Sequence, residues 1–395
     1  MSEQQKTVIR HAKIVTEEET IQDGALVISE GTIEFIGTEE AFAAQQSYQK
    51  LPSVDYEGDW LLPGFIDVHV HGGFGHDFME ANDAALERIT RFHAQNGTTT
   101  MLATTVTAPK EAIDRVLAGV NSWQENEVKG ARLAGVHLEG PFLSKVFPGA
   151  QNPEHMIPAR IDWLEEWTSA YPGLIRMMTL APEVEGNMDC IEWLRKNNIV
   201  AACGHTDAEY EEILEAKKRG LQHAVHTFNA MKPLHHRNPG TVGAVLTDDD
   251  ISCEIIADGH HVHPACIDLL VRAKGRDRLI LITDAMSAAG MEDGEYNLGD
   301  LKVRVKDGVA RLKEGESLAG STLTMIQAFR FFVETVGVSI EETSRMASGN
   351  PARLIGLDDE IGSISLGKKA DLLRLDSKLQ LKEVWRDGQL IDNKN

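Results

Sequence analysis

Between residues 60 and 290, short runs of apolar and β-branched residues alternate with longer amphipathic stretches. The runs are short enough for buried strands, whereas stretches such as 82–97 and 207–220 repeat apolar positions every three or four residues, as a helix does. Strands that alternate with helices in this way predict a parallel sheet. The runs cover residues 65–71, 98–107, 132–142, 175–183, 199–206, 223–230, 251–259 and 279–286.

The number of runs distinguishes between two parallel-sheet architectures. Eight βα units within about 225 residues fit a (β/α)8 TIM barrel better than an open doubly wound sheet. No GxGxxG motif follows the first run, which argues against a dinucleotide-binding sheet. We therefore predict an α/β protein in which residues 59–355 form a (β/α)8 barrel.

The two ends of the chain have a different pattern. Residues 1–58 read as short strands joined by turns, and residues 356–395 return to short strands. We expect these two segments to pair into one small, discontinuous β-sandwich domain. Residues 291–320 alternate and are punctuated by glycine, which predicts a β-hairpin inserted after the eighth run.

The net charge of the chain argues against two classes of partner, nucleic acids and anionic membranes. The chain has 39 basic and 61 acidic side chains, a net charge of −22. Binding to nucleic acid or to an anionic membrane surface relies on clustered Lys and Arg, so we expect neither partner. No run approaches 18 apolar residues, and the first residues are polar where a signal peptide has its apolar run. We therefore expect a cytoplasmic protein.

Polar residues occur at the ends of five of the eight runs. The carboxyl ends of barrel strands meet on one face, where enzymes of this fold keep their active sites. Each residue alone has an ordinary structural explanation, such as a salt bridge for the glutamate or a helix cap for the aspartate. Together they predict a site for Zn²⁺, Fe²⁺, Co²⁺ or Mn²⁺, which imidazole and carboxylate ligands suit. The residues are His69, His71, Glu139, His205, His226 and Asp284.

Seven motifs in a fixed order connect these residues to a known family. They are LLPGFIDVHVHG, HLEGPF, GHT, HTFNAM, DGHH, ITDAM and LAGS, and IGSISLGKKADLLRLD follows them. With these motifs the chain resembles the metal-dependent amidohydrolase superfamily, and within it the N-acetylglucosamine-6-phosphate deacetylase family. The resemblance covers most of the chain. It implies hydrolysis of N-acetyl-D-glucosamine 6-phosphate to D-glucosamine 6-phosphate and acetate, in amino-sugar catabolism or cell-wall recycling.

The resemblance also implies a role for each of the six residues. Glu139, His205 and His226 match the principal metal ligands of the family. His69 and His71 match a pair that helps some members to hold a second metal ion, so we expect one or two Zn²⁺ or Fe²⁺ ions per subunit. Asp284 matches the catalytic aspartate. A metal ion lowers the pKa of bound water toward ~7, and a carboxylate can take its proton as base and return it as acid.

A further set of residues matches the family's contacts with the sugar phosphate. The resemblance also implies a homodimer, in which Arg237 reaches the neighbouring subunit's site. Where the family usually has Lys-Gly-Ala-His, this chain has FPGAQ, so Gln151 replaces a histidine. The candidate substrate-binding residues are Ala150, Gln151, Asn229, Ala230, Arg237, His261, Leu318, Ala319 and Gly320.

Two alternative functions remain open at this point. One is another amidohydrolase, such as a dihydroorotase or an N-acyl-amino-acid deacylase. Many such enzymes bridge two metal ions with a carboxylated lysine on the fourth strand, and the run 175–183 contains no lysine. The other is a scaffold barrel without catalysis, which the presence of all six residues disfavours. The net charge does not exclude a single phosphate, because a phosphate responds to local groups such as Arg237 and His261.

Overall fold

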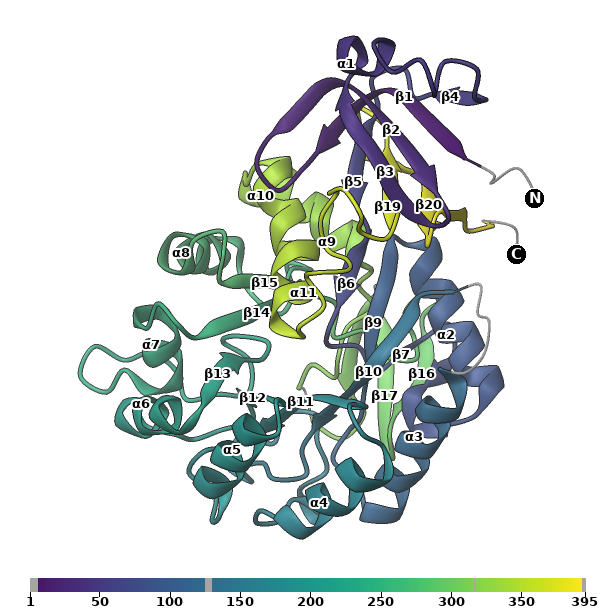
Figure 1. Cartoon of the computed structure of the whole chain (residues 1–395). Coiled ribbons are helices and arrows are strands. Elements are labelled where there is room, and N and C mark those ends of the chain that lie inside the picture. The colour runs from purple at the N-terminus through teal and green to yellow at the C-terminus, as the bar shows by residue number, and fades with distance from the viewer. Residues whose placement is uncertain (1–5, 125–129, 316, 393–395) are drawn as a thin grey trace.

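The computed structural model describes residues 6–124, 130–315 and 317–392. Its larger part is a sheet of eight parallel strands that pair in chain order, surrounded by helices (Figure 1). Each predicted run overlaps one of these strands, so the predicted barrel is confirmed. The strands are β6 (Phe65–Asp67), β9 (Thr98–Thr104), β10 (Arg132–Glu139), β11 (Ile175–Leu180), β12 (Val200–Cys203), β13 (Leu221–Ala224), β14 (Ser252–Ile256) and β15 (Leu279–Ile282).

The barrel closes just beyond the ends of its first and last strands. The amide nitrogen of Asp284 lies 2.9 Å from the carbonyl oxygen of His69, and the amide of His71 lies 2.8 Å from the carbonyl oxygen of Ala285. At the ends of the two strands themselves, the Thr283 hydroxyl donates to the Asp67 carboxylate at 2.5 Å. The polar residues that follow β6 and β15 are therefore neighbours in space.

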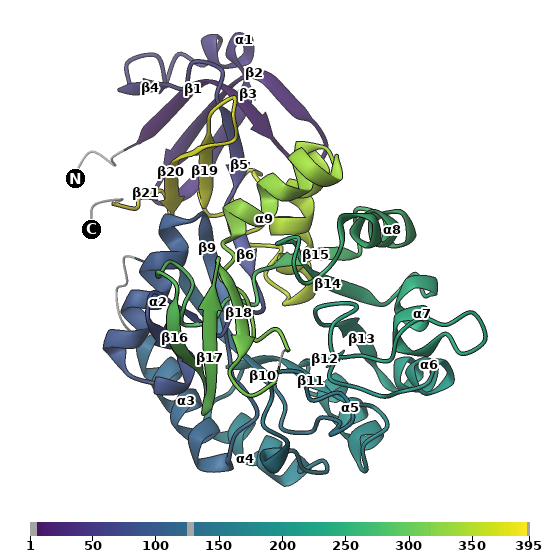
Figure 2. The same ribbon diagram turned by 180° about the vertical axis from the view of Figure 1, so that it is seen from behind.

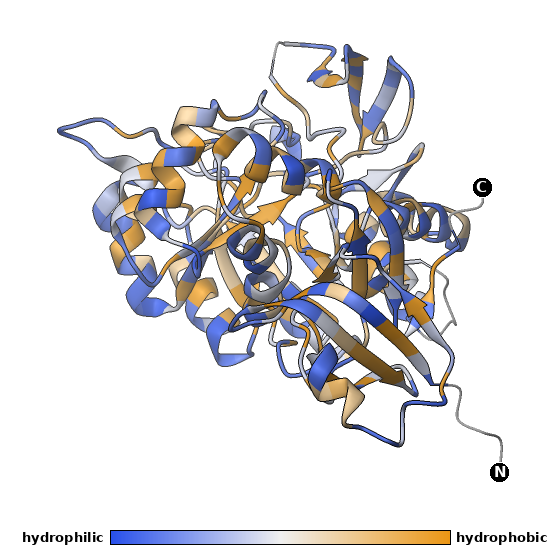
Figure 3. Ribbon diagram, turned by 90° about the horizontal axis from the view of Figure 1, so that it is seen from above, coloured by the Kyte–Doolittle hydropathy of each residue, from blue (hydrophilic) through white to orange (hydrophobic). Residues whose placement is uncertain are grey.

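The helices cover the outside of the barrel with their apolar faces. In α2, for example, the side chain of Asn82 accepts a hydrogen bond from the amide of Ala85 at the first turn, and Leu86 and Ile89 are buried. Figure 3 shows mostly apolar strands inside and helices of mixed hydropathy around them. The helices are α2 (Asp83–Gln95), α3 (Lys110–Trp123), α4 (Ile161–Ala170), α5 (Asn187–Lys196), α6 (Tyr210–Arg219), α7 (Gly240–Thr247), α8 (Pro264–Lys274), α9 (Met325–Phe331), α10 (Ile340–Ser344) and α11 (Asn350–Leu354). Two 3₁₀ turns, η1 (Phe78–Glu80) and η2 (Pro153–His155), and two π-helical turns, η3 (Phe332–Val336) and η4 (Arg345–Gly349), complete them.

The ends of the chain form a second sheet, which lies above the barrel in Figure 1 and contains both purple and yellow strands. Its strand β5 lies between β1 and β19, so segments more than 300 residues apart are neighbours. β5 lies inside the range 59–355 expected for the barrel, but its hydrogen bonds are with strands of the terminal sheet. The elements are β1 (Thr7–Val15), β2 (Thr20–Ser29), β3 (Thr32–Thr38), α1 (Glu39–Ala43), β4 (Ser53–Asp55), β5 (Trp60–Pro63), β19 (Leu372–Leu375), β20 (Leu381–Arg386) and β21 (Gln389–Leu390).

Two small antiparallel sheets complete the fold. The segment after β15 forms three strands rather than a simple hairpin, and they lie in front of the barrel in Figure 2. These strands are β16 (Gly294–Leu298), β17 (Leu301–Lys306) and β18 (Val309–Leu312), and the other sheet pairs β7 (Gly72–Gly73) with β8 (His76–Asp77). Within the described part of the chain, every helix is too short or too polar to cross a membrane.

Candidate active site

Six polar side chains converge at the carboxyl ends of the barrel strands, with the Glu139 carboxylate at their centre. Its Oε1 lies 3.2 Å from Nε2 of His69, 3.2 Å from Nε2 of His205 and 3.1 Å from Nε2 of His226. Its Oε2 lies 3.3 Å from Nε2 of His71, and the same nitrogen lies 3.2 Å from Oδ1 of Asp284. All six side chains are buried. The strand ends therefore bring together the set that the sequence singled out.

Main-chain carbonyl groups orient three of the four imidazole rings. Nδ1 of His205 lies 3.0 Å from the carbonyl oxygen of Pro148, and Nδ1 of His226 lies 3.2 Å from that of Asn229. Nδ1 of His71 contacts the carbonyl oxygen of Thr104 at 3.3 Å. Because a carbonyl oxygen can only accept a hydrogen bond, Nδ1 of each of these rings carries a proton, and Nε2 is the ring atom that faces Glu139.

The close grouping of these Nε2 atoms is the observation that best fits a metal ion. Nε2 of His205 and Nε2 of His226 lie only 3.2 Å apart. Nε2 of His69 is buried and has no hydrogen-bond partner of good geometry among the described residues. Two overlapping groups have ligand atoms within 4.8 Å of one another, namely His69, Glu139 and His226, and His69, His71 and Asp284. Buried ring nitrogens and carboxylate oxygens gathered this closely are the ligand types that divalent transition metals take, so the residues fit one or two divalent metal ions.

The electrostatics of the site keep both carboxyl groups ionised. Burial would raise the pKa of Glu139, but the imidazoles of His69 and His205 hold it well below its ordinary value. Burial likewise opposes ionisation of Asp284, and the hydrogen bond from His71 with the nearby His69 lowers the pKa of that carboxyl. A carboxylate at position 284 can therefore accept a proton at neutral pH.

Three of the six residues have backbone angles that non-glycine residues rarely adopt. The φ angle is +47° at His205, +28° at His226 and +49° at Asp284. Left-handed backbone costs about 1–3 kcal/mol at a non-glycine residue and is concentrated at functional sites. The turn at each strand end therefore points the side chain into the site at the expense of local strain.

Glu254 also belongs to the site, although it lies in none of the motifs that mark the other residues. It lies on β14 and is fully buried. One of its oxygens lies 2.8 Å from Nδ1 of His69 and accepts from the amide of His226 at 3.2 Å. Its other oxygen lies 3.1 Å from Nε2 of His223. The signal in the sequence was an acidic residue inside the apolar run ISCEIIADG, where a buried carboxylate needs partners.

The residues expected to bind substrate lie at different distances from this centre. Asn229 contacts His226 through its carbonyl oxygen, and the carbonyl oxygen of Ala230 accepts from the amide of Thr206 at 3.1 Å. Ala150 lies in the loop that contacts His205. Gln151 donates directly to the carboxylate of Glu139.

Leu318, Ala319 and Gly320 form the return from β18 to the barrel. The amide of Ser321 donates to the carbonyl oxygen of Asp284 at 2.7 Å, so this segment is held against the candidate base. A Cβ atom on Gly320 would come within 2.9 Å of the same oxygen, which explains why only glycine fits there.

The two residues expected to contact the far side of a substrate are His261 and Arg237. Nδ1 of His261 lies 2.6 Å from the carboxylate of Asp258, in the loop after β14. Arg237 is exposed on the loop between β13 and α7, where its guanidinium lies 2.7 Å from Nε2 of His236. Among the described residues, neither side chain forms a hydrogen bond or an ion pair with Glu139.

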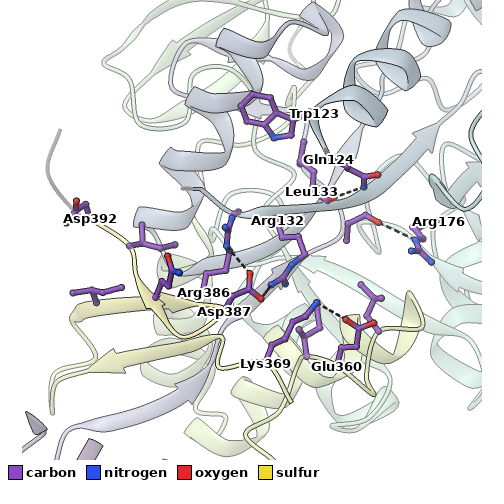
Figure 4. Close-up of a pocket in the computed structure, with 17 residues that line it drawn as sticks. Trp123, Gln124, Arg132, Leu133, Arg176, Glu360, Lys369, Arg386, Asp387 and Asp392 are labelled. Atoms are coloured by element: carbon purple, nitrogen blue, oxygen red, sulfur yellow. Dashed lines mark hydrogen bonds and ion pairs between the residues drawn. The ribbon is translucent and has the colours of Figure 1, made fainter. Parts of the chain in front are cut away.

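A cavity of about 820 Å³ lies at the opposite end of the barrel (Figure 4). It is lined by the starts of β10 and β11 and by the end of the terminal sheet. Several of its charged side chains form ion pairs: Arg132 bonds Asp387 at 2.6 Å, and Lys369 bonds Glu360 at 2.7 Å. The cavity is therefore the joint between the two parts of the fold and shares no residue with the candidate site.

Residues 60–391 match the Amidohydrolase family. N-acetylglucosamine-6-phosphate deacetylase from Bacillus subtilis is 38% identical over 377 residues, which cover 95% of this chain and 94% of that protein. N-acetylgalactosamine-6-phosphate deacetylase from Escherichia coli O157:H7 is also 38% identical, over 97% of this chain and 98% of that protein.

Solved structures of N-acetylglucosamine-6-phosphate deacetylases have a similar fold. A mutant of N-acetyl-D-glucosamine-6-phosphate deacetylase from Mycobacterium smegmatis, in complex with N-acetyl-D-glucosamine 6-phosphate, superposes with a TM-score of 0.91 and 34% identity. The match covers 98% of this chain and 99% of that one. The enzyme from Thermotoga maritima matches with a TM-score of 0.87 and 35% identity, over 98% of this chain and 100% of that one.

Proposed function

This chain belongs to the amidohydrolase family, and we propose that it hydrolyses the acetamido group of N-acetyl-D-glucosamine 6-phosphate to give D-glucosamine 6-phosphate and acetate. The observation that carries this proposal is the convergence of four imidazole groups on Glu139, with the ionised Asp284 beside them. A scaffold barrel has no need of such a strained and buried set, and the relatives that cover nearly the whole chain are sugar-phosphate deacetylases.

Glu139, His205 and His226 are the principal metal ligands in this proposal, and His69 and His71 extend the site toward Asp284. Imidazole and carboxylate groups suit both Zn²⁺ and Fe²⁺, so we propose one or two of these ions per subunit. When bound, such an ion lowers the pKa of a water molecule and polarises the amide carbonyl group of the substrate. Glu254 fixes the ring of His69 through a hydrogen bond of 2.8 Å.

Asp284 is the proposed general base and general acid. Its carboxylate accepts a proton from the attacking water, whose oxygen forms a bond to the acetyl carbon. The carbon–nitrogen bond then breaks, and Asp284 returns the proton to the departing amine nitrogen. The products are the amino sugar phosphate and acetic acid, which loses the second proton of the water to the free amine or to solvent and becomes acetate, and the carboxylate of Asp284 is regenerated. The lowered pKa of Asp284 keeps it in the ionised form that this sequence of steps needs.

The sugar phosphate contacts are proposed from the loops around the centre. Ala150, Asn229 and Ala230 line the side next to His205 and His226, and Leu318, Ala319 and Gly320 cover the side next to Asp284. His261 binds a sugar hydroxyl group, and Arg237 binds the phosphate because its fork matches two phosphate oxygens.

N-acetyl-D-galactosamine 6-phosphate is a second candidate substrate. The relative from Escherichia coli O157:H7 that is named for this sugar is 38% identical, as is the Bacillus subtilis relative named for the glucosamine compound. The two sugars differ only in the configuration of one hydroxyl group, and the chemistry at the amide is the same. Identity alone therefore does not separate them.

We propose a cytoplasmic homodimer in which Arg237 completes the site of the neighbouring subunit. Arg237 is exposed, and within the described part of the chain its guanidinium bonds His236 rather than any residue of the centre of its own subunit. An arginine that acts across an interface needs this exposure. A sugar phosphate carries about two negative charges, which an apolar membrane excludes, so substrate made inside the cell stays in the cytoplasm.

A comparison of three substrates tests the proposal. The metal-loaded protein is assayed for acetate release from N-acetylglucosamine 6-phosphate, N-acetylgalactosamine 6-phosphate and N-acetylglucosamine. We expect the highest kcat/KM for the first. A higher kcat/KM for the second would favour the galactosamine alternative. Equal kcat/KM values for N-acetylglucosamine 6-phosphate and N-acetylglucosamine would contradict the proposal that the site binds the phosphate group.

A further inference from the structure

The loop Phe147–Gln151 contacts two of the proposed metal ligands at once. The carbonyl oxygens of Phe147 and Pro148 lie 3.3 Å and 3.0 Å from Nδ1 of His205. The ring of His205 also packs on Gly149, where an added Cβ atom would come within 3.0 Å of the ring carbon Cε1. Gly149 has a φ of +55°, so glycine suits both the backbone angle and the close approach.

The same loop ends in a side chain that reaches Glu139. Gln151 is only 4% exposed. Its Oε1 accepts a hydrogen bond from the amide of Thr107 at 2.7 Å, and its Nε2 donates to Oε2 of Glu139. Because a main-chain amide can only donate, Thr107 fixes which end of the glutamine amide faces Glu139. The side chain therefore bridges the ends of β9 and β10 through one acceptor and one donor.

We propose that Gln151 is a positioning residue that holds Glu139 in the orientation needed to bind metal, rather than a contact for the sugar. Oε1 of Glu139 faces His69, His205 and His226, whereas Oε2 faces His71. The donor of Gln151 holds Oε2 in place, so the carboxylate does not rotate out of this arrangement. Both polar ends of the Gln151 amide already have a partner in the protein, and the side chain is buried, so its hydrogen bonds are directed to Thr107 and Glu139 rather than outward. This inference rests on the metal centre of the proposed function.

Binding of Zn²⁺ to the metal-free protein, measured by competition with a chromophoric chelator, tests the inference without any assay of activity. We expect Gln151→Ala and Gln151→Asn to weaken Zn²⁺ binding by about 10- to 100-fold, the usual cost of losing a hydrogen bond to a metal ligand. Asparagine is one methylene shorter and cannot bridge Thr107 and Glu139. The absorption spectrum of the Co²⁺-loaded protein should change in the same variants, because the geometry of the ligands changes.

Two further variants serve as matched controls. Gln151→His should restore Zn²⁺ affinity, since one ring nitrogen can accept from Thr107 while the other donates to Glu139. Asn152→Ala changes the next residue of the same loop, whose side chain bonds the exposed Asp300 at 2.8 Å, and should leave affinity unchanged. Circular dichroism establishes that each variant is folded, and the asparagine variant remains informative where the smaller alanine destabilises the chain.

Wild-type Zn²⁺ affinity and an unaltered Co²⁺ spectrum in a folded Gln151→Asn variant would overturn the inference. In that case a raised KM would identify Gln151 as a direct substrate contact. The proposed function fails in a different way, through the absence of acetate release by the metal-loaded wild-type protein. A loss of Zn²⁺ affinity in the variants would then still establish Gln151 as a positioning residue of the metal centre.

Discussion

The main-chain amide of Asp284 donates to the carbonyl oxygen of His69 at 2.9 Å, across the seam where the last strand of the barrel meets the first. The same two residues face each other through their side chains, with Oδ1 of Asp284 3.8 Å from Nε2 of His69. Closure of the barrel therefore fixes the proposed base relative to the proposed metal ligands. Because the contact across the seam uses main-chain atoms, a change of the Asp284 side chain leaves it in place.

Asp284→Asn should fold, bind metal and lose most of its turnover. The amide keeps the size of the carboxylate but cannot take up a proton, and general acid–base catalysis contributes about 10²- to 10⁴-fold to rates of this kind. We expect kcat to fall by that factor with little change in metal content. The measurement is steady-state acetate release together with elemental analysis of the same sample.

Asp293→Asn is the matched control for that variant. Asp293 is an exposed carboxylate that accepts from the amides of Asp307 and Gly308, next to the three-stranded sheet. The Asp293→Asn variant should have the same kcat as the wild type. Turnover near the wild-type value in Asp284→Asn itself would refute the role of Asp284 as base.

Arg237→Ala should weaken the reaction with phosphorylated sugars specifically. Hydrogen bonds to a charged group contribute about 1.5–3 kcal/mol, so kcat/KM for N-acetylglucosamine 6-phosphate should fall about 10- to 100-fold. The value for N-acetylglucosamine should not change. Arg272→Ala, which removes an exposed arginine paired with Asp268 on α8, is the control. An equal loss on both sugars would contradict the assignment of Arg237 to the phosphate.

Mixing two impaired variants tests whether Arg237 acts across a dimer. In a mixed dimer of Arg237→Ala and Asp284→Asn subunits, one site combines an intact Asp284 with an intact Arg237 from the neighbour. After random reassociation, half of the dimers are mixed and each has one complete site, so about a quarter of the wild-type activity should return. Activity no greater than the sum of the separate variants would mean that Arg237 serves its own subunit.

Arg132 joins the barrel to the terminal sheet, and its loss should lower stability. Its guanidinium lies 2.9 Å from the carboxylate of Asp371, which is 5% exposed, and 2.6 Å from that of Asp387. Arg132→Met leaves the Asp371 carboxylate buried without its cation, so the free energy of unfolding should fall by about 3 kcal/mol in urea titrations. Arg272→Met, which removes an exposed pair, should cost less than about 1 kcal/mol. Equal stability of the two variants would show that the joint contributes nothing.

His93 should make the fold sensitive to mild acid. Burial lowers the pKa of this imidazole to about 4, against about 6.5 in the unfolded chain. Between these values the unfolded chain binds a proton that the folded chain does not, so the free energy of unfolding falls as the pH drops. From pH 7 to pH 5 the wild type should lose about 2 kcal/mol more than His93→Gln, whose side chain does not titrate. The same loss in both proteins would contradict this assignment.

The barrel was predictable from the sequence because its signals are local and repeated. Eight apolar runs separated by amphipathic helices require a parallel sheet, and the strand ends of such a sheet must meet. His69 and Asp284 are 215 residues apart, yet the order of the strands alone places both beside Glu139. The pairing of β5 with β1 and β19 joins segments that are distant in the sequence, and no local pattern in residues 60–63 indicates it.

Contacts made by loops and by single buried charges were harder to predict. Gln151 was expected at the sugar, but the turn of the loop at Gly149 directs its amide to Glu139 instead. Glu254 lies in the middle of an apolar strand, and nothing nearby in the sequence reveals that its partners are His69 and His223. These contacts form where segments distant in the sequence pack together. The periodicity of apolar residues along the chain does not indicate which distant side chains will meet.

Removing the metal ion and adding it back tests directly whether deacetylation depends on the metal. The protein is treated with a chelator, and acetate release from N-acetylglucosamine 6-phosphate is followed before and after Zn²⁺ or Fe²⁺ is added back under anaerobic conditions. We predict that activity disappears with the metal and returns with one or two ions bound per subunit, with one acetate formed for each free amine. Acetate release that continues in the metal-free protein, or that no divalent ion restores, would contradict the proposed function.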